Sequence, residues 1–208
     1  MTMALRDEIR HQAALAGRVI EASAKQPIQG ARVQLIAAPA GFMTLLALRQ
    51  KQFGGAWDSM DVRPDRTTTA PDGHFHFLDL PDGDYTLTAL LPSGGTRYGT
   101  VQVNSTVKRD SAGNLKPVIF DLALPSTNLQ GKVTAQTGGG PVELAAVRVQ
   151  GSGETTYTSA DGTFRIVALE KGSRTVSVSA AGYQTASQVV VFAQPGDAQV
   201  LNFVLTAV

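Results

Sequence analysis

The stretch TTTAPDGHFHFLDLPDGDYTLTAL, residues 67–90, decides the fold because the chain contains it twice. Its counterpart is TTYTSADGTFRIVALEKGSRTVSV, residues 155–178. Turn glycines and alternate apolar residues match between the two, so the repeated feature is a scaffold. The matched pairs are Gly73 and Gly162, Phe75 and Phe164, Phe77 and Ile166, Leu80 and Leu169, Gly83 and Gly172, and Leu87 and Val176.

Turn signals bound the central strand of the first copy. Asp72-Gly73 and Asp82-Gly83 suit turns, since aspartate caps local backbone and glycine accepts a positive φ. Between these turns two phenylalanines alternate with His74 and His76. Residues two apart in a strand share a face. We therefore expect the phenylalanines to fill a core and the two histidines to face solvent.

The flanking sequences repeat as well. LAGRVIEASAKQPIQGARVQLIAA, residues 15–38, corresponds to LQGKVTAQTGGGPVELAAVRVQGS, residues 129–152. Near the ends of the two copies, VIFDLALP, residues 118–125, corresponds to LNFVLTAV, residues 201–208. Short strands at regular spacing, separated by Gly and Pro turns, indicate antiparallel β-sandwiches.

At the level of families, GRVIEASAKQPIQGARVQL followed by TAPDGHFHFLDLPDGDYTLTA resembles the carboxypeptidase regulatory-like domain, a transthyretin-like or prealbumin-like β-sandwich. GKVTAQTGGGPVELAAVRV with TSADGTFRIVALEKGSRTVSVSAAGY resembles a second copy. The resemblance covers nearly the whole chain except the first dozen residues and one insertion. It implies an accessory, structural or adhesive protein without catalytic residues.

The predicted fold class is therefore all-β, with two tandem Greek-key, transthyretin-like β-sandwiches, a short N-terminal helix and a helical insertion in the first domain. We place the first sandwich at residues 14–125 and the second at 127–208. Pro125-Ser126-Thr127 joins them, and so short a link should restrict their relative motion.

Composition excludes several classes of function. A net charge of +1, from 18 basic and 17 acidic residues, gives no drive toward nucleic acid. The absence of cysteine excludes disulfides and thiolate chemistry. Asp7 and Glu8 interrupt any signal-peptide core, and no apolar run suits membrane insertion. We expect cytoplasmic synthesis, and a role in an exported or extracellular particle remains compatible with it.

Metal and catalytic chemistry find little support. His74 and His76 on one face have the geometry of a two-imidazole metal clip, but no third ligand is apparent, so a solvated or interface face is favoured. Turn formation accounts better than calcium binding for the nearby aspartates, which do not follow an EF-hand spacing. No nucleophile elbow, phosphate loop or zinc-helix motif is present. We expect no metal, no cofactor and no catalytic residue. The aspartates for which turn formation is favoured over calcium binding are Asp72, Asp79, Asp82 and Asp84.

The insertion, residues 38–66, is absent from the second copy. Apolar residues at helical spacing precede Gly54-Gly55, which suits a helix end. One interpretation, slightly favoured, is that this helix covers its own sandwich. The other is that it forms a docking surface for another subunit through aromatic and aliphatic anchors. The candidate residues are Phe42, Leu46, Phe53 and Trp57, the last being the only tryptophan.

The N-terminal segment, residues 1–13, carries Leu5, Ile9 and Ala13 four positions apart. This spacing predicts a short amphipathic helix over residues 3–13. Such a helix needs a packing partner, so Leu5 and Ile9 are further interaction candidates, on the chain's own domain or as a tether to a larger particle.

The sequence favours a structural or adaptor protein whose partners are subunits of a larger assembly or further copies of the chain. A phage-tail-like or contractile injection particle would reconcile cytoplasmic synthesis with an outside role. The alternative is a carbohydrate- or surface-binding, adhesin-like module, and an enzyme ranks third. VQVNSTV, residues 101–107, and SQVVVFA, residues 187–193, are possible edge strands for pairing between subunits. Glycan-contact candidates are Trp57, Tyr98, Tyr157 and Tyr183.

Overall fold

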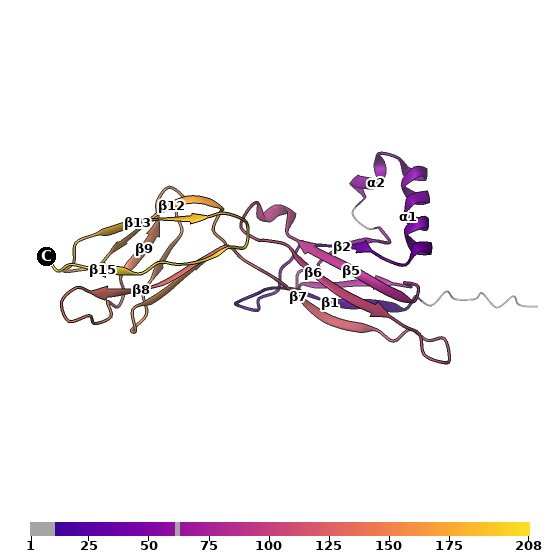
Figure 1. The fold of residues 1–208 in the computed structure, drawn as a ribbon, viewed down its shortest axis with the longest axis horizontal. Coiled ribbons are helices and arrows are strands. Elements are labelled where there is room, and N and C mark those ends of the chain that lie inside the picture. Colours follow the sequence, from indigo (N-terminus) through magenta and orange to yellow (C-terminus); the bar gives the residue numbers. More distant parts are fainter. Residues whose placement is uncertain (1–10, 61–62) are drawn as a thin grey trace, which may run out of the picture. The chain divides into compact units, whose positions relative to one another are not determined.

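The computed structural model describes residues 11–60 and 63–208 (Figure 1). Its contacts divide the chain into two compact units. Among the described residues, the first contains residues 11–20, 25–90 and 101–123, and the second contains residues 124–208. Two short segments that precede the second copy in sequence, residues 21–24 and 91–100, belong to the second unit.

The first unit is built from two β-sheets. The three-stranded sheet has the order β4 (His74–Leu78), β1 (Ala13–Glu21) and β7 (Val118–Leu124). The four-stranded sheet has the order β3 (Arg66–Thr68), β2 (Arg32–Ala37), β5 (Gly83–Leu90) and β6 (Val101–Val107). The buried side chains come from both sheets, and the largest include Leu15, Leu80, Tyr85, Leu87 and Leu122.

The second unit repeats this plan. One sheet has the order β11 (Thr163–Val167), β8 (Asn128–Ala135) and β14 (Ala198–Val200), and β15 (Phe203–Leu205) also pairs with β8. The other has the order β10 (Thr155–Tyr157), β9 (Ala146–Val149), β12 (Gly172–Ser179) and β13 (Ala186–Phe192). A single hydrophobic cluster lies between them, with Leu129, Val147, Phe164, Val176 and Phe203 among its members. The all-β prediction with tandem sandwiches is confirmed.

The prediction of purely antiparallel sheets is wrong for the closing strands. β14 and β15 both pair with β8 in parallel. The preceding strand, β13, lies in the other sheet. The chain therefore crosses from one sheet to the other before it returns beside β8, and a crossover connection produces parallel pairing.

The alternation predicted for the repeated stretch is confirmed. In β4 the phenylalanines Phe75 and Phe77 are buried, whereas His74 and His76 are exposed. β11 shows the same alternation of buried and exposed residues. The predicted edge strands are also confirmed, since β6 and β13 each lie at the end of a sheet.

A glycine in the first strand of each copy permits close backbone approach. A Cβ atom at Gly17 would lie 1.7 Å from the carbonyl oxygen of Phe120, and one at Gly131 would lie 1.8 Å from that of Leu201. Both distances are far below any van der Waals contact. The Gly-basic-Val motif is therefore required where the closing strand meets the first one.

A buried threonine ties the repeated turn to a neighbouring loop in both copies. The hydroxyl of Thr69 donates to the carbonyl of Ile28 at 2.6 Å and accepts the amide of Ala31 at 2.9 Å. The hydroxyl of Thr158 donates to the carbonyl of Val142 at 2.6 Å and accepts the amide of Ala145 at 2.8 Å. One side chain in each unit thus satisfies two buried backbone groups.

Replacing Thr158 by valine should destabilise the second unit by about 1–3 kcal/mol, because the amide of Ala145 and the carbonyl of Val142 lose their partner while the volume is kept. Thr69→Val should do the same to the first unit. Urea unfolding followed by circular dichroism measures both effects. Thr68→Val, at an exposed position of β3, is the control, and an equal loss in all three variants would contradict the assignment.

Residues 91–100 contribute to the second unit through named polar contacts. Arg97 Nε donates to Glu170 Oε1 at 2.9 Å, and the amide of Thr96 donates to Glu170 Oε2 at 3.0 Å. The amide of Thr127 donates to the carbonyl of Arg97 at 2.8 Å. The hydroxyl of Thr96 also donates to Oε2 of Glu170, and this bond is the largest cause that lowers the pKa of Glu170. The bonds from Arg97 and from the Thr96 amide lower it further. The boundaries that we propose from the sequence follow the repeats, whereas the structural units do not.

The insertion contains the one helix that its spacing predicted, α1 (Ala40–Phe53), and a second short helix, α2 (Ala56–Ser59), that the sequence did not predict. Gly54, with φ 53°, lies at the end of α1. Of the helix predicted over residues 3–13, the end is corrected, because Ala13 begins β1 and its strand partner is Leu78; residues 3–10 lie outside the described part of the chain. Leu5 and Ile9 lie outside the described residues. None of the described helices is long and apolar enough to cross a membrane.

Candidate functional site

The helical insertion is fixed to the first unit by aromatic contacts. Phe42 of α1 packs edge-on against Tyr85 of β5, with ring centroids 6.2 Å apart and an interplanar angle of 72°. Trp57 of α2 is buried, and Phe53 stacks on it at 6.2 Å and 22°. Leu46 is the second buried residue of α1. Burial of Tyr85 raises its pKa to about 12.

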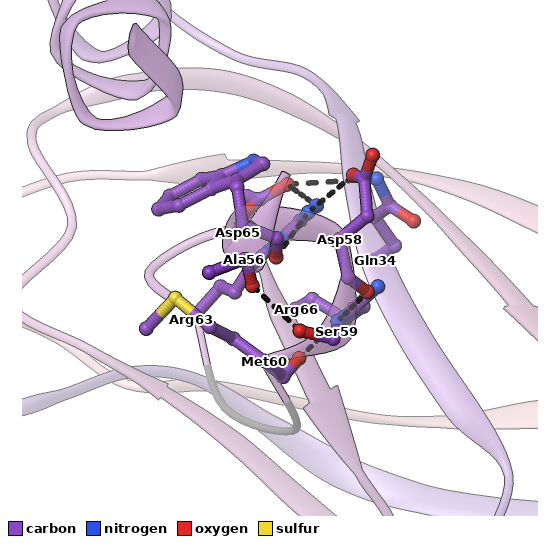
Figure 2. Close-up of polar contacts among 9 residues, drawn as sticks. Gln34, Ala56, Asp58, Ser59, Met60, Arg63, Asp65 and Arg66 are labelled. Atoms are coloured by element: carbon purple, nitrogen blue, oxygen red, sulfur yellow. Dashed lines mark hydrogen bonds and ion pairs between the residues drawn. The ribbon is translucent and has the colours of Figure 1, made fainter. Parts of the chain in front are cut away.

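A buried ion pair lies beneath α2 (Figure 2). Arg63 binds Asp65 with two parallel hydrogen bonds, Nε to Oδ1 at 3.0 Å and Nη2 to Oδ2 at 2.7 Å. Their side chains are only 6% and 7% exposed. The guanidinium of Arg63 also lies 4.6 Å from the ring centroid of Trp57, a cation–π contact. The pair therefore holds the tryptophan in place.

A second arginine completes this charged cluster, which we define as Arg63, Asp65 and Arg66. Nη2 of Arg66 donates to the carbonyl of Asp58 at 3.1 Å and to that of Met60. Burial lowers the pKa of Arg66, and repulsion from Arg63 lowers it further. Figure 2 shows the side chains converging from α2, the following loop and β3. Within the cluster Arg63 is paired with Asp65, and Arg66 is held by backbone carbonyls.

The other side of α1 faces solvent. Only two of its fourteen residues are buried, and Figure 1 shows the helix beyond the edge of the strands in the first unit. Leu48 is 61% exposed. Leu45 and Leu48 are exposed and three positions apart, so they are neighbours on the helix surface. We call this pair the apolar face of α1.

A groove of about 660 Å³ lies on the second unit, along the outer face of the sheet formed by β8, β11 and β14. Gln130 and Lys132 of β8 face outward there, opposite Arg165 and Thr163 of β11 in the strand register. Tyr157, which is 62% exposed, forms one wall. Polar and cationic side chains therefore lie beside the exposed ring of Tyr157, and the buried Phe164 also lines the groove.

The sequence family follows from the two copies of this architecture. The family model described as carboxypeptidase regulatory-like domain matches residues 14–112 and 128–206, together most of the chain. The chain belongs to the carboxypeptidase regulatory-like domain family. No curated protein sequence matches this carboxypeptidase regulatory-like protein.

Solved structures resemble the tandem at low sequence identity. A streptococcal ancillary pilin shares 12% identity with a TM-score of 0.38, and the alignment covers 97% of this chain and 63% of the pilin. The shaft pilin SpaA from Lactobacillus rhamnosus GG shares 13% identity with a TM-score of 0.45, covering 96% and 98%. The Bacillus anthracis TIE protein shares 14% identity with a TM-score of 0.39, covering 94% and 34%. The chain thus spans less than two thirds of the streptococcal and the Bacillus anthracis proteins.

The interaction candidates in the insertion fall into two groups in this carboxypeptidase regulatory-like protein. Phe42, Leu46 and Trp57 are buried within the first unit and are not available as an exposed docking surface. Phe53 is partly exposed. Trp57 lies under the guanidinium of Arg63, which is itself buried by its pair with Asp65. The accessible surface is the apolar face of α1, and neither of its two residues was among the candidates from the sequence.

His74 and the four aspartates of the opening stretch take part in ion pairs or hydrogen bonds. Nδ1 of His74 lies 3.0 Å from Oδ2 of Asp72, and hydrogen bonding from the His74 amide is the largest cause that lowers the pKa of Asp72. Asp79 pairs with His11, and Asp82 with Arg109. Asp84 accepts the hydroxyl of Thr106. Within residues 11–60 and 63–208, no three His, Cys, Asp or Glu side chains are placed to hold a metal ion.

The glycan-contact candidates also differ in accessibility. Trp57 is buried, and Tyr98 and Tyr183 are partly buried. Tyr157 alone of these four is well exposed and lines the groove of the second unit. The charged cluster and the groove had no assignment from the sequence. The run Arg63-Pro64-Asp65-Arg66, which begins six positions after the tryptophan, was the sequence signal that could have suggested a charge pair there.

Proposed function

We propose that this protein is a non-catalytic structural module that docks onto a protein subunit of a larger assembly through the apolar face of α1. The carrying observation is that this fourteen-residue helix buries only Phe42 and Leu46. Isolated helices of this length are marginal in water and depend on packing of an apolar side. A partner that covers Leu48 and its neighbours would supply that packing.

The interior of the insertion supports this proposal. The charged cluster and the stacking of Phe53 on Trp57 hold α2 and the end of α1 in a defined place. A rigid, preorganised apolar surface binds with a smaller entropic cost than a mobile one. The area between α1 and β2 adds a groove of about 430 Å³ lined by Ile36, Met43 and Ala47. A partner side chain could enter beside the helix.

The partner class in this proposal is a protein, either another subunit or a second copy of this chain. A particle of the phage-tail or contractile-injection type is one form of such an assembly. Light scattering on the purified chain measures self-association. Sedimentation of native extract, with identification of the proteins that travel with the chain, measures assembly with other subunits.

Replacing Leu48 by glutamate tests the proposal. A charge at the centre of a docked helix should weaken the association at least ten-fold, as for other buried interface residues. Stability should change by less than about 0.5 kcal/mol, because the position is exposed in the free chain. Sedimentation and thermal unfolding give the two readouts.

Ile119→Glu is the matched control, since Ile119 is 77% exposed on β7 and lies outside the insertion. Unchanged association in Leu48→Glu would refute the proposal. So would a chain that sediments solely as a free monomer in native extract.

A further inference from the structure

The two copies carry different charges on equivalent outer faces. In the first unit, Arg18 of β1 pairs with Asp121 of β7, with Nη2 to Oδ2 at 3.1 Å and Nε to Oδ1 at 3.4 Å. In the second unit the corresponding cation is Lys132. Across the part of the chain that the structure describes, no ion pair includes Lys132 or the nearby Arg165.

Sequence differences between the copies explain the missing counter-charge. The alignment of VIFDLALP with LNFVLTAV places Val204 where the first copy has Asp121. The alignment of the repeated stretch places Arg165 where the first copy has His76. The second face has therefore lost a carboxylate and gained a guanidinium.

The nearest acidic side chain is already hydrogen-bonded within its own turn. Asp161 accepts the hydroxyls of Ser159 and Thr163, each at 2.7 Å, and the amide of Thr163 at 3.0 Å. These bonds lower its pKa to about 2, the Ser159 hydroxyl contributing most and Lys132 adding a smaller attraction. All three bonds end on Oδ1, so Asp161 orders the rim of the groove through this one oxygen.

The remaining walls carry hydrogen-bonding groups and a flat ring. Oδ1 of Asn202 accepts the amide of Lys132 at 2.9 Å, which fixes the side-chain amide at the groove. Gln130 of β8 also faces outward at the groove. Tyr157 offers an exposed aromatic surface with a hydroxyl at its end. A volume of about 660 Å³ lies within the ~300–1,000 Å³ range of small-ligand sites.

We propose that this groove binds a carboxylated carbohydrate, such as a segment of an acidic polysaccharide. Lys132 and Arg165 bind the carboxylate of a uronic acid residue, since charge-assisted hydrogen bonds to carboxylates are the strong ones. Tyr157 packs against the apolar face of a sugar ring. The amides of Gln130 and Asn202 bind sugar hydroxyls.

Two other anionic ligands fit the groove less well. Nucleic acid affinity comes from many phosphate contacts, whereas this face offers two cations on a chain of net charge +1. An acidic peptide would use the same cations. It would leave the exposed ring of Tyr157 and the side-chain amides of Gln130 and Asn202 without a role. The combination of cations, amides and one aromatic ring favours an acidic sugar.

Calorimetric titration of the full chain with a galacturonic acid hexamer tests the inference. The fully methyl-esterified hexamer is the matched neutral probe, and we expect it to bind at least ten-fold more weakly. Lys132→Met and Arg165→Met should each weaken binding of the acidic hexamer about ten-fold, which corresponds to the loss of one charge-assisted contact. Tyr157→Ser should weaken both probes.

The first copy supplies controls within the same molecule. Arg18→Met and His76→Met change the equivalent positions and should leave binding unchanged. Equal binding of the esterified hexamer, or equal losses in the first-copy variants, would overturn the assignment. Binding of hexaglutamate as tightly as the acidic hexamer, without dependence on Tyr157, would show an unspecific anion patch and would also overturn it.

Discussion

Gly131→Ala is expected to abolish stable folding of the second unit. The added Cβ would lie 1.8 Å from the carbonyl oxygen of Leu201 and 2.9 Å from the ring of Phe164. Both neighbours belong to the packed interior, where backbone and ring have little room to move. We expect a loss of at least about 3 kcal/mol, at the upper end of what overpacking costs. Urea unfolding followed by circular dichroism measures it.

Gly140→Ala is the control, because a Cβ there meets no atom within 4 Å. Gly17→Ala should repeat the effect in the first unit, where the carbonyl of Phe120 lies 1.7 Å from the added atom. A loss below about 1 kcal/mol in either variant would mean that the closing strand can move away from the first strand.

Asp65→Asn is expected to release the helical insertion. The change leaves Arg63 as an unpaired charge at a side-chain exposure of 6%. Removing one partner of a buried pair typically costs about 3–5 kcal/mol. The structure can avoid this cost by opening the loop after α2, which would bring Trp57 into water. Because Trp57 is the only tryptophan, a red shift of its fluorescence below the main unfolding transition reports this opening.

Asp58→Asn is the control, since the Asp58 side chain is 82% exposed and its one ion-pair contact with Arg63 is long, at 3.5 Å. The double variant Arg63→Met, Asp65→Leu should recover much of the loss, because it removes both buried charges together. An unshifted tryptophan spectrum in Asp65→Asn would argue against the role of the pair.

The scaffold was predictable because its signals are local. Asp-Gly turns and the alternation of buried and exposed residues in β4 and β11 depend on residues that are neighbours in sequence. Because the alternation occurs in both copies, it is not a chance pattern. The parallel pairing of β14 and β15 was not predictable in this way. It depends on which sheet holds β13, and no local pattern encodes that.

The candidate sites depend on contacts that sequence spacing does not reveal. The helical spacing of the insertion correctly gave α1, but it did not show that Trp57 would lie under Arg63. The groove of the second unit combines Lys132, Tyr157 and Arg165 from three strands. Their meeting follows from the order of strands in two sheets, so the sequence suggested Tyr157 as an exposed ring without its cationic neighbours.

The membership of residues 91–100 in the second unit limits how this protein can be divided. A cassette cut at the repeat boundary, residues 127–208, lacks Thr96 and Arg97. Transplanted into another protein, it would carry Glu170 without these partners and Thr127 without the carbonyl that accepts its amide hydrogen. The repeated segment and the contact-defined unit therefore have different boundaries, and recombination at the repeat border would separate groups that are hydrogen-bonded to one another.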